Sequence, residues 1–547
     1  MKNQLFFKNI INGIPDKLPP KKKYDKSLNH APPQKHNLSA EEIKLAIKNA
    51  LRYFSKNKHA ILAREFKEEL DEFGKIYMYR FKPNYKIKAR HINQFPHKSR
   101  QAASIMFMIS NNLDTAVAQH PDELITYGGN GAVFQNWAQY LLTMQYLSEM
   151  TNKQTLVLYS GHPLGLFPSQ KNSPRLVVTN GMMIPNYSTV KDLQKLNSLG
   201  VTQYGQMTAG SFMYIGPQGI VHGTTITILN ANRMLKIKSN NVKLFVSSGL
   251  GGMSGAQPKA AKIAGLISVI AEVNKNALKK RLTQGWIDQT TSDLNELIQK
   301  IKHAKKYNKV TSIGFLGNIV DVWEKLDEED VFVDIGSDQT SLHNPFHGGY
   351  YPAGLSFEDA NMLIQKNPNA FKKLVQKSLK KHVKTINKHV KKGTYFFDYG
   401  NAFLLEAGRA KADIFNTSGG YKYPSYVQDI MGPMCFDFGF GPFRWICMSN
   451  KASDLKKTDQ IAQRVLEKLT HSAPREIKQQ MRDNIEWIKA AQKNKLVVGA
   501  QARILYANSD GRIKIATAFN QAIKKGEIGP VVIGRDHHDV SGTDSPF

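Results

Sequence analysis

At 547 residues, with 41% hydrophobic and 22% charged residues, the chain suits roughly two to four folded domains, which excludes a single small module and a largely disordered protein. Its two cysteines, Cys435 and Cys447, exclude a disulfide framework and a four-cysteine zinc site and indicate a reducing compartment, the cytoplasm. The net charge of +31 comes mostly from lysines scattered along the chain, without an RNA-reading signature or zinc-finger spacing, so we expect a solvated surface rather than a nucleic-acid partner.

The N-terminal segment begins with an extended stretch. Residues 14–36 carry five prolines and a run of lysines, a composition typical of an extended lead-in. Ser39 and Glu42 then form a capping-box pattern before apolar residues at helical spacing, which predicts a helix. No stretch of about 18 consecutive apolar residues occurs in the chain, so we expect neither secretion nor a membrane span.

From about residue 110, short apolar runs alternate with helical segments, which predicts an α/β domain. The most informative block has a strand over residues 243–247, a glycine-rich turn over residues 249–255, and a helix that continues to Glu272. Glycines allow a tight turn that approaches a pyrophosphate. The match is imperfect because Ser254 replaces the third glycine of the fingerprint, but Glu272 follows at a distance suited to ribose hydroxyls, so the block favours NAD over NADP.

Two further strand units follow. Residues 310–318 predict a strand that enters a helix over residues 319–326, and residues 331–335 predict another strand. The polar loop 336–345 then lies where open α/β sheets bind ligands. His343 in this loop is either a metal ligand or a base, but without a second ligand at suitable spacing we predict no metal and a hydrogen bond to a cofactor or to the backbone.

Residues 363–393 form a basic helical stretch with apolar residues at three- or four-residue steps. Such a stripe serves a membrane surface, a partner helix or the protein's own core, and we favour the core.

Cys435 lies in the aromatic and glycine-rich segment 434–445, where a cysteine is either an inert core residue or a catalytic thiol. The chain has no G-x-S-x-G elbow, P-loop or H-E-x-x-H motif, so the usual hydrolase and kinase signatures are absent.

Several long motifs resemble the urocanase, or urocanate hydratase, family along nearly all of residues 100–547. They include Tyr127-Gly-Gly-Asn-Gly131, Tyr159-Ser-Gly-His-Pro-Leu-Gly-Leu-Phe167, Tyr204-Gly-Gln-Met-Thr-Ala-Gly-Ser211, Gly249-Leu-Gly-Gly-Met-Ser-Gly-Ala-Gln257 and Ser337-Asp-Gln-Thr-Ser-Leu-His343. The resemblance implies an α/β fold in which a Rossmann-like NAD-binding domain is set between N- and C-terminal segments of an α+β core. We expect an N-terminal extension with a helix (1–84), the N-terminal domain (85–212), the Rossmann-like domain (213–424) and a truncated C-terminal domain (425–547).

The same resemblance implies a cytoplasmic hydro-lyase of histidine degradation that adds water to urocanate. It also implies a homodimer with no membrane partner, and a tightly held NAD⁺ that acts as an electrophile rather than a hydride carrier. The family's cysteine falls on Cys435, which is then expected to line the substrate pocket as an acid or base. The family's cofactor contacts fall on Gly128, Gly129, Gln206, Gly252, Met253, Ser254, Glu272, Asn318, Ile319, Gln339, Thr340, Ser341, Leu342, His343, Tyr350, Tyr351 and Tyr399.

The sequence departs from the family pattern in two places. Ala277 stands where the family often has an arginine after the acidic ribose ligand. The chain ends at Phe547, before the glycine-rich stretch that completes the family's cofactor site. The alternative hypothesis is therefore a catalytically impaired NAD-binding protein of the urocanase type that lacks this C-terminal segment.

Overall fold

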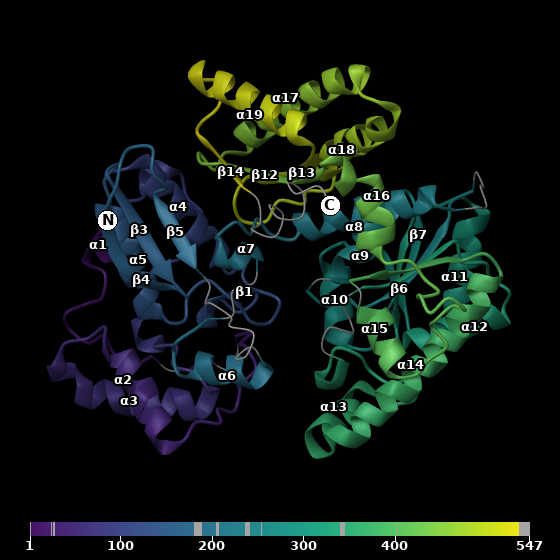
Figure 1. The fold of residues 1–547 in the computed structure, drawn as a ribbon, viewed down its shortest axis with the longest axis horizontal. Helices are drawn as coiled ribbons and strands as arrows, with labels where there is room; N and C mark the ends of the chain where they lie inside the picture. The colour runs from purple at the N-terminus through teal and green to yellow at the C-terminus, as the bar shows by residue number, and fades with distance from the viewer. Residues whose placement is uncertain are drawn as a thin grey trace.

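The chain folds into three regions, which Figure 1 shows in purple to blue, in teal to green, and in yellow-green. The computed structural model describes residues 2–22, 24–25, 28–179, 189–203, 207–235, 241–252, 254–339, 345–400 and 402–534. The middle region is a parallel α/β sheet, and the regions before and after it mix helices with small sheets. The predicted α/β architecture with a Rossmann-like central domain is therefore confirmed.

The N-terminal region packs helices around a three-stranded sheet in the order β4-β3-β5. Ser39 and Glu42 form both hydrogen bonds of the predicted capping box at the start of α2. Phe6 and Phe66 share one buried core with Phe107 and Trp137, so the first 84 residues pack on the sequence that follows them. The elements are α1 (Lys2–Asn12), α2 (Ala40–Leu51), α3 (His59–Phe73), α4 (Arg100–Asn112), β1 (Ile125–Tyr127), β2 (Gly131–Ala132), α5 (Trp137–Glu149), β3 (Gln154–Tyr159), β4 (His162–Pro168), β5 (Leu176–Thr179), α6 (Val190–Ser198) and α7 (Met207–Gly210).

The central region begins with α8 (Gln218–Arg233) and contains a six-stranded parallel sheet in the order β11-β10-β6-β7-β9-β8. Apolar side chains of β6 and β7 alternate between two buried clusters, one on each face of the sheet, which explains their nearly continuous apolar sequences. The elements after α8 are β6 (Leu244–Ser248), α9 (Gln257–Ile263), β7 (Ile267–Glu272), α10 (Lys275–Thr283), β8 (Gln289–Thr291), α11 (Leu294–Lys306), β9 (Ser312–Leu316), α12 (Ile319–Glu328), β10 (Ile335–Gln339), α13 (Phe357–Lys366), α14 (Pro368–Lys391), β11 (Tyr395–Tyr399) and α15 (Ala402–Arg409).

Two predicted boundaries are wrong. The helix after the glycine turn does not continue to Glu272, because Gly265 adopts a left-handed conformation (φ +80°) and the β-branched residues after it form β7, which Glu272 ends. The strand predicted over residues 331–335 instead spans Ile335–Gln339, so residues 336–339 belong to the strand and not to the polar loop predicted over residues 336–345. Asp334 accepts a hydrogen bond from the Leu244 amide at 2.8 Å through its side chain, and the ladder with β6 starts one residue later.

The basic stretch around α14 faces its own core, as favoured from the sequence. Its apolar stripe is buried against the central sheet, and some lysines on its exposed side pair with acids of α12, such as Lys388 with Asp327 at 2.8 Å. In the described part of the chain, no helix is both long and apolar enough to cross a membrane.

The C-terminal region is an antiparallel sheet, ordered β13-β12-β14, with helices packed against it. Its elements are η9, a π-helix (Tyr426–Met431), α16 (Gly432–Met434), β12 (Gly441–Cys447), α17 (Ala452–Ser472), α18 (Arg475–Lys493), β13 (Ala502–Ala507), α19 (Ser509–Lys524) and β14 (Val531–Gly534). Within it, the guanidinium of Arg503 donates two hydrogen bonds to the Asp459 carboxylate, at 3.0 and 2.8 Å, and both side chains are buried.

Replacing Arg503 with methionine leaves the Asp459 carboxylate buried without its cation, which costs about 3–5 kcal/mol. We expect a clearly lower thermal unfolding temperature for Arg503→Met, measured by calorimetry. Lys514→Met is the matched control, because it breaks the exposed pair with Asp510 (2.7 Å), whose contribution is about 1 kcal/mol or less. Equal unfolding temperatures for the two variants would contradict the expectation.

Candidate functional site

The glycine turn leaves the carboxyl end of β6 in a conformation that requires glycine. Gly249 has φ +89°, and a Cβ atom there would lie 2.6 Å from the Ser254 hydroxyl oxygen. A Cβ atom at Gly252 would meet nothing within 4 Å, so this part of the turn faces open space. Two hydrogen bonds hold the start of the turn to β7 and to α9. The Gly249 amide donates to the Ala271 carbonyl at 2.8 Å, and the Gln257 side chain donates to the Ser248 carbonyl at 2.9 Å.

Glu272 ends the neighbouring strand β7 and holds the same turn. One carboxylate oxygen accepts a hydrogen bond from the Leu250 amide at 2.6 Å, and the other accepts one from the Asn274 amide at 2.8 Å. Burial raises the pKa of Glu272, although the backbone amides oppose this shift. Since each oxygen retains a further lone pair, the carboxylate can still accept hydrogen bonds from a diol such as a ribose.

A cavity of about 250 Å³ lies beside this turn, at the carboxyl ends of the strands. It sits next to β6, where the strand order of the parallel sheet changes direction: β7 lies on one side of β6 and β10 on the other. Ligands of open α/β sheets bind at such a switch point. Asn318 helps to shape its wall by capping α12 and donating from its side chain to the Tyr351 carbonyl at 2.9 Å. The lining residues are Ser248, Gly249, Gly251, Ser254, Ala271, Glu272, Val273, Asn274, Ala277, Gly317, Asn318, Ile319, Gly348, Gly349, Tyr350, Tyr351 and Phe357.

The structure brings together part of the predicted cofactor set. Ser254, Glu272, Asn318, Ile319, Tyr350 and Tyr351 line the cavity, as does Ala277, where the resemblance led us to expect an arginine. Gly128 and Gly129 do not line it. They form a left-handed turn between β1 and β2 in the N-terminal region, with φ values of 70° and 80°. Gln206, Met253, Thr340, Ser341, Leu342 and His343 lie outside the described residues, and Gln339 ends β10.

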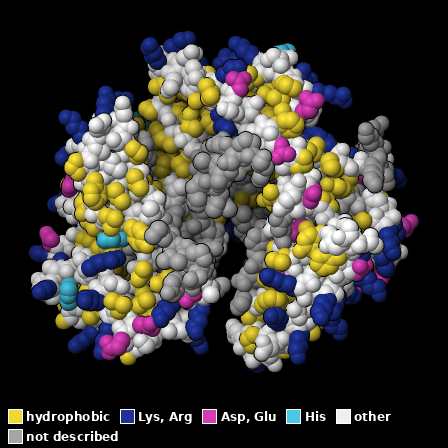
Figure 2. Space-filling view, viewed as in Figure 1, with side chains coloured by type: hydrophobic (Ala, Val, Ile, Leu, Met, Phe, Trp, Pro, Cys, Tyr) yellow, Lys and Arg dark blue, Asp and Glu magenta, His cyan; other side chains and the backbone are white. Residues whose placement is uncertain are grey.

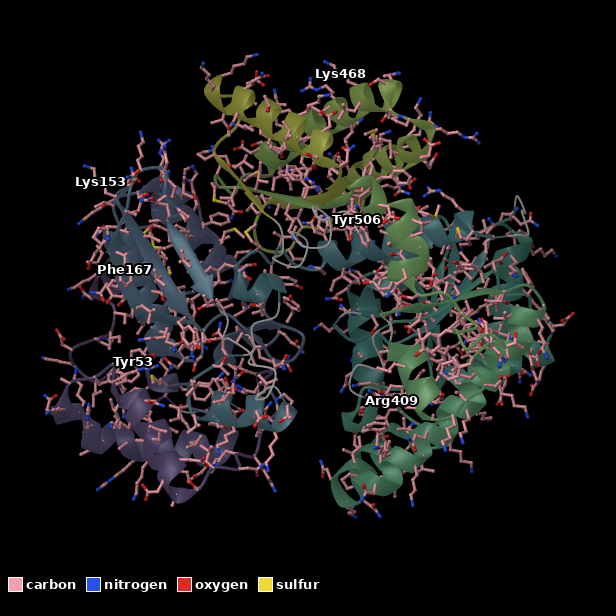
Figure 3. All side chains as sticks on the ribbon, in the orientation of Figure 1. Tyr53, Lys153, Phe167, Arg409, Lys468 and Tyr506 are labelled. Carbon is pink, nitrogen blue, oxygen red and sulfur yellow. The ribbon has the colours of Figure 1, made fainter. Side chains whose placement is uncertain are left out.

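Tyr399 belongs to a second group of side chains, between the central and C-terminal regions. Its ring stacks on that of Tyr426, with centroids 4.4 Å apart and planes 7° apart. Its hydroxyl accepts a hydrogen bond from the Thr224 hydroxyl at 3.4 Å. A Cβ atom at Gly223 would lie 3.8 Å from the Tyr399 hydroxyl and 3.4 Å from that of Tyr506, so two phenols converge on one glycine of α8. Figure 3 labels Tyr506 at this junction.

Cys435 follows the π-helix η9 and is fully buried. Burial, and secondarily the charge of Asp483, raise the pKa of its thiol far above the usual value, so the group is a neutral thiol at physiological pH. It is not among the residues that line the 250 Å³ cavity. Its buried neighbours are Ile226, Met431, Phe440, Leu469 and Met481.

Arg281 is a residue of this site that the sequence analysis missed. It lies on α10 and donates to the Leu250 carbonyl at 3.1 Å, to the Gly251 carbonyl and to the Gln284 side chain. In the sequence Arg281 directly follows Lys279 and Lys280, so it reads as part of an exposed basic run. The available signal was its spacing of three residues from Leu278, which places both side chains on the same face of a helix. These two side chains are the buried ones of α10.

Comparison with known proteins covers all three regions. Residues 87–213 match the urocanase N-terminal domain, residues 216–430 the urocanase Rossmann-like domain, and residues 433–547 the urocanase C-terminal domain. A probable urocanate hydratase of Dictyostelium discoideum is 58% identical over 549 residues, which cover 98% of this chain and 81% of that protein. A urocanate hydratase of Mus musculus is 58% identical (95% and 78% covered), and one of Homo sapiens is 55% identical (98% and 81% covered).

The two amide contacts of Glu272 can be tested directly. In Glu272→Gln the carboxamide NH₂ group replaces one carboxylate oxygen and faces a backbone N–H, so one of the two hydrogen bonds is lost. A lost hydrogen bond to a charged group costs about 1.5–3 kcal/mol. We therefore expect the Leu250 or Asn274 amide to exchange hydrogen about tenfold faster. Hydrogen exchange followed by mass spectrometry measures this. Glu296→Gln on α11, whose carboxylate is not buried, is the control; unchanged exchange near residue 250 in Glu272→Gln would contradict the role of Glu272.

Proposed function

The chain belongs to the urocanase family, and on this premise we propose that it is a urocanate hydratase, a hydro-lyase of histidine degradation that adds water to urocanate to form 4-imidazolone-5-propanoate. The observation that carries the proposal is the presence of all three family domains in one chain that is 55–58% identical to urocanate hydratases over most of its length. The alternative is a catalytically impaired protein that lacks the C-terminal segment completing the cofactor site, and the match of residues 433–547 to the family's C-terminal domain counts against it.

The proposed cofactor is NAD⁺, which the residues of the cavity fit. The turn around Gly252 is open to a ligand, since a Cβ atom there would have no neighbour within 4 Å, and the Glu272 carboxylate keeps acceptor capacity for ribose hydroxyls. When bound, NAD⁺ supplies an electron-poor pyridinium ring that can act as an electron sink for the imidazole of urocanate. A negative charge at Glu272 disfavours the extra phosphate of NADP, which supports NAD⁺ as the cofactor.

We propose that the protein orients the two reacting rings and keeps bulk water away from them. The second group of side chains supports this role, because Tyr399 and Tyr426 form a stacked aromatic pair, the Thr224 hydroxyl bonds Tyr399, and the Tyr399 and Tyr506 hydroxyls converge on Gly223. Holding reactants in one geometry lowers the entropic part of the barrier. Tyr399 was carried over as a cofactor contact, and its place in this group supports contact with the reacting end of the cofactor.

Cys435 is proposed as a proton donor to the substrate. The raised pKa argues against a thiolate nucleophile and also makes the thiol a weak acid, so the proposed role rests on the position of Cys435 at the family's cysteine and not on its pKa. The π-helix η9 ends shortly before Cys435, with the short helix α16 between them, and this supports a functional rather than a purely packing role, because π-helical turns are frequent at functional sites.

A homodimer in the cytoplasm is also proposed. The two cysteines are free and buried, which supports a reducing compartment. Leu164, Phe167 and Val177, on β4 and β5, are exposed apolar side chains that support a contact surface for a second copy. Figure 2 shows apolar side chains gathered over this part of the N-terminal region, and Figure 3 labels Phe167 there.

Purified protein mixed with urocanate should consume it, seen as loss of the near-ultraviolet absorbance of urocanate, and should release NAD⁺ in a one-to-one ratio on denaturation. Loss of absorbance occurs because hydration removes the conjugation between the ring and the side chain. Bound NAD⁺ without turnover would contradict the proposed activity but support the proposed cofactor. The absence of both NAD⁺ and turnover would contradict the proposal as a whole.

Changing Cys435 to alanine removes the proposed donor, so we expect turnover to fall by about 10²-fold or more, with NAD⁺ content and unfolding temperature close to those of the wild type. Cys435→Ser is the matched variant, because it keeps an O–H donor of similar size and should retain more activity than alanine. Wild-type turnover in both variants, or a parallel loss of turnover, NAD⁺ and stability, would show that Cys435 only packs the core.

A further inference from the structure

Arg281 is an unusual charge for the interior of a Rossmann-like domain. Its side chain is buried on α10, directly beneath the glycine turn, and its guanidinium lies 4.9 Å from the centre of the Trp286 ring. None of its described hydrogen bonds goes to a carboxylate. The Leu250 and Gly251 carbonyls and the Gln284 side chain accept them. Burying a cation costs several kcal/mol, so a residue kept in this place points to a function that an apolar residue would not supply.

The direction of the two carbonyls explains what Arg281 does. In a planar trans peptide, the C=O of one residue and the N–H of the next point in opposite directions. With the Leu250 and Gly251 carbonyls turned down onto the guanidinium, the amides of Gly251 and Gly252 point away from it. Gly251 lines the 250 Å³ cavity, and Gly252 has open space around it. Successive amides that point to one side form an anion-binding concavity.

The glycine at position 255 is matched to this arrangement. A Cβ atom at Gly255 would lie 2.2 Å from Nε of Arg281, so any other residue would displace the guanidinium from this position. The Gly255 amide also donates to the Gly251 carbonyl at 3.2 Å, which is the same oxygen that Arg281 holds. The turn, Gly255 and Arg281 therefore form one interlocked unit, in which the arginine is the central donor.

We propose that Arg281 is the positioning residue of the dinucleotide site: by holding two consecutive carbonyls it turns the Gly251 and Gly252 amides outward and so controls how long the pyrophosphate of NAD⁺ stays bound. The inference rests on the proposed function and extends it. Arg281 itself does not touch the ligand. Only the planar fork of an arginine, and not the point charge of a lysine, holds both carbonyls and Gln284 at once.

The test measures how fast NAD⁺ bound to the purified holoenzyme exchanges with isotopically labelled NAD⁺ in solution. Arg281→Ala and Arg281→Lys should both exchange about tenfold faster or more than the wild type, since each loses charged hydrogen bonds. Arg409→Ala is the matched control, an exposed arginine of the same domain (Figure 3), and should exchange like the wild type. Wild-type exchange in Arg281→Lys would overturn the inference, because charge alone would then suffice.

Gly255→Ala provides a second variant that keeps the arginine but displaces its guanidinium. It should speed the exchange of NAD⁺ in the wild-type background and have little further effect in Arg281→Ala, because the atom it collides with is gone. Additive effects of the two changes would overturn the inference. If the wild type holds no NAD⁺, the proposed function fails, and hydrogen exchange at residues 249–256 then decides the inference: it must accelerate in Arg281→Ala, and unchanged exchange refutes it.

Discussion

The burial of β6 on both faces of the parallel sheet is the constraint on which the site depends. Every residue of this strand is buried, so its backbone can meet a ligand only where the strand ends, at Ser248. The order in which strands are added to the sheet changes direction at β6, so β7 lies on one side of it and β10 on the other. These two facts place the glycine turn, Glu272 and Asn318 around one cavity, although they lie on different strand units of the sequence.

Helix α8 connects this sheet to the rest of the molecule. It leaves the N-terminal region and runs beneath the C-terminal region, as Figure 1 shows. A buried and a partly buried polar contact join it to α18: the His222 ring bonds the Asn484 side chain at 2.9 Å, and Arg233 bonds the Asp483 carboxylate at 2.6–2.7 Å. Such contacts require one register between the two helices, because a shifted helix would leave buried polar groups without partners. The same register sets Gly223 against the phenols of Tyr399 and Tyr506.

The surplus positive charge has a different physical role from the charges of the site. Figure 2 shows lysine and arginine side chains spread over the visible face. Exposed pairs such as Lys388 with Asp327 contribute little, because water and salt screen them. Arg281 and Arg503 are buried and hold specific oxygen atoms, and each therefore imposes a local geometry. Burial, and not the number of charges, separates the structural cations from the solvated ones.

The sequence by itself determined the family, the α/β class, the glycine turn and Glu272, because these depend on local patterns: buried strand runs, glycines at a tight turn, and an acid at fixed spacing. It misplaced the helix before Glu272, since one glycine at 265 ends that helix and single-residue conformations are poorly encoded in periodicity. Only the tertiary structure separated Gly128 and Gly129 from the cavity, set Tyr399 against Tyr426, and placed Arg281 under the turn. These contacts join residues from different elements, and long-range packing decides them rather than local sequence.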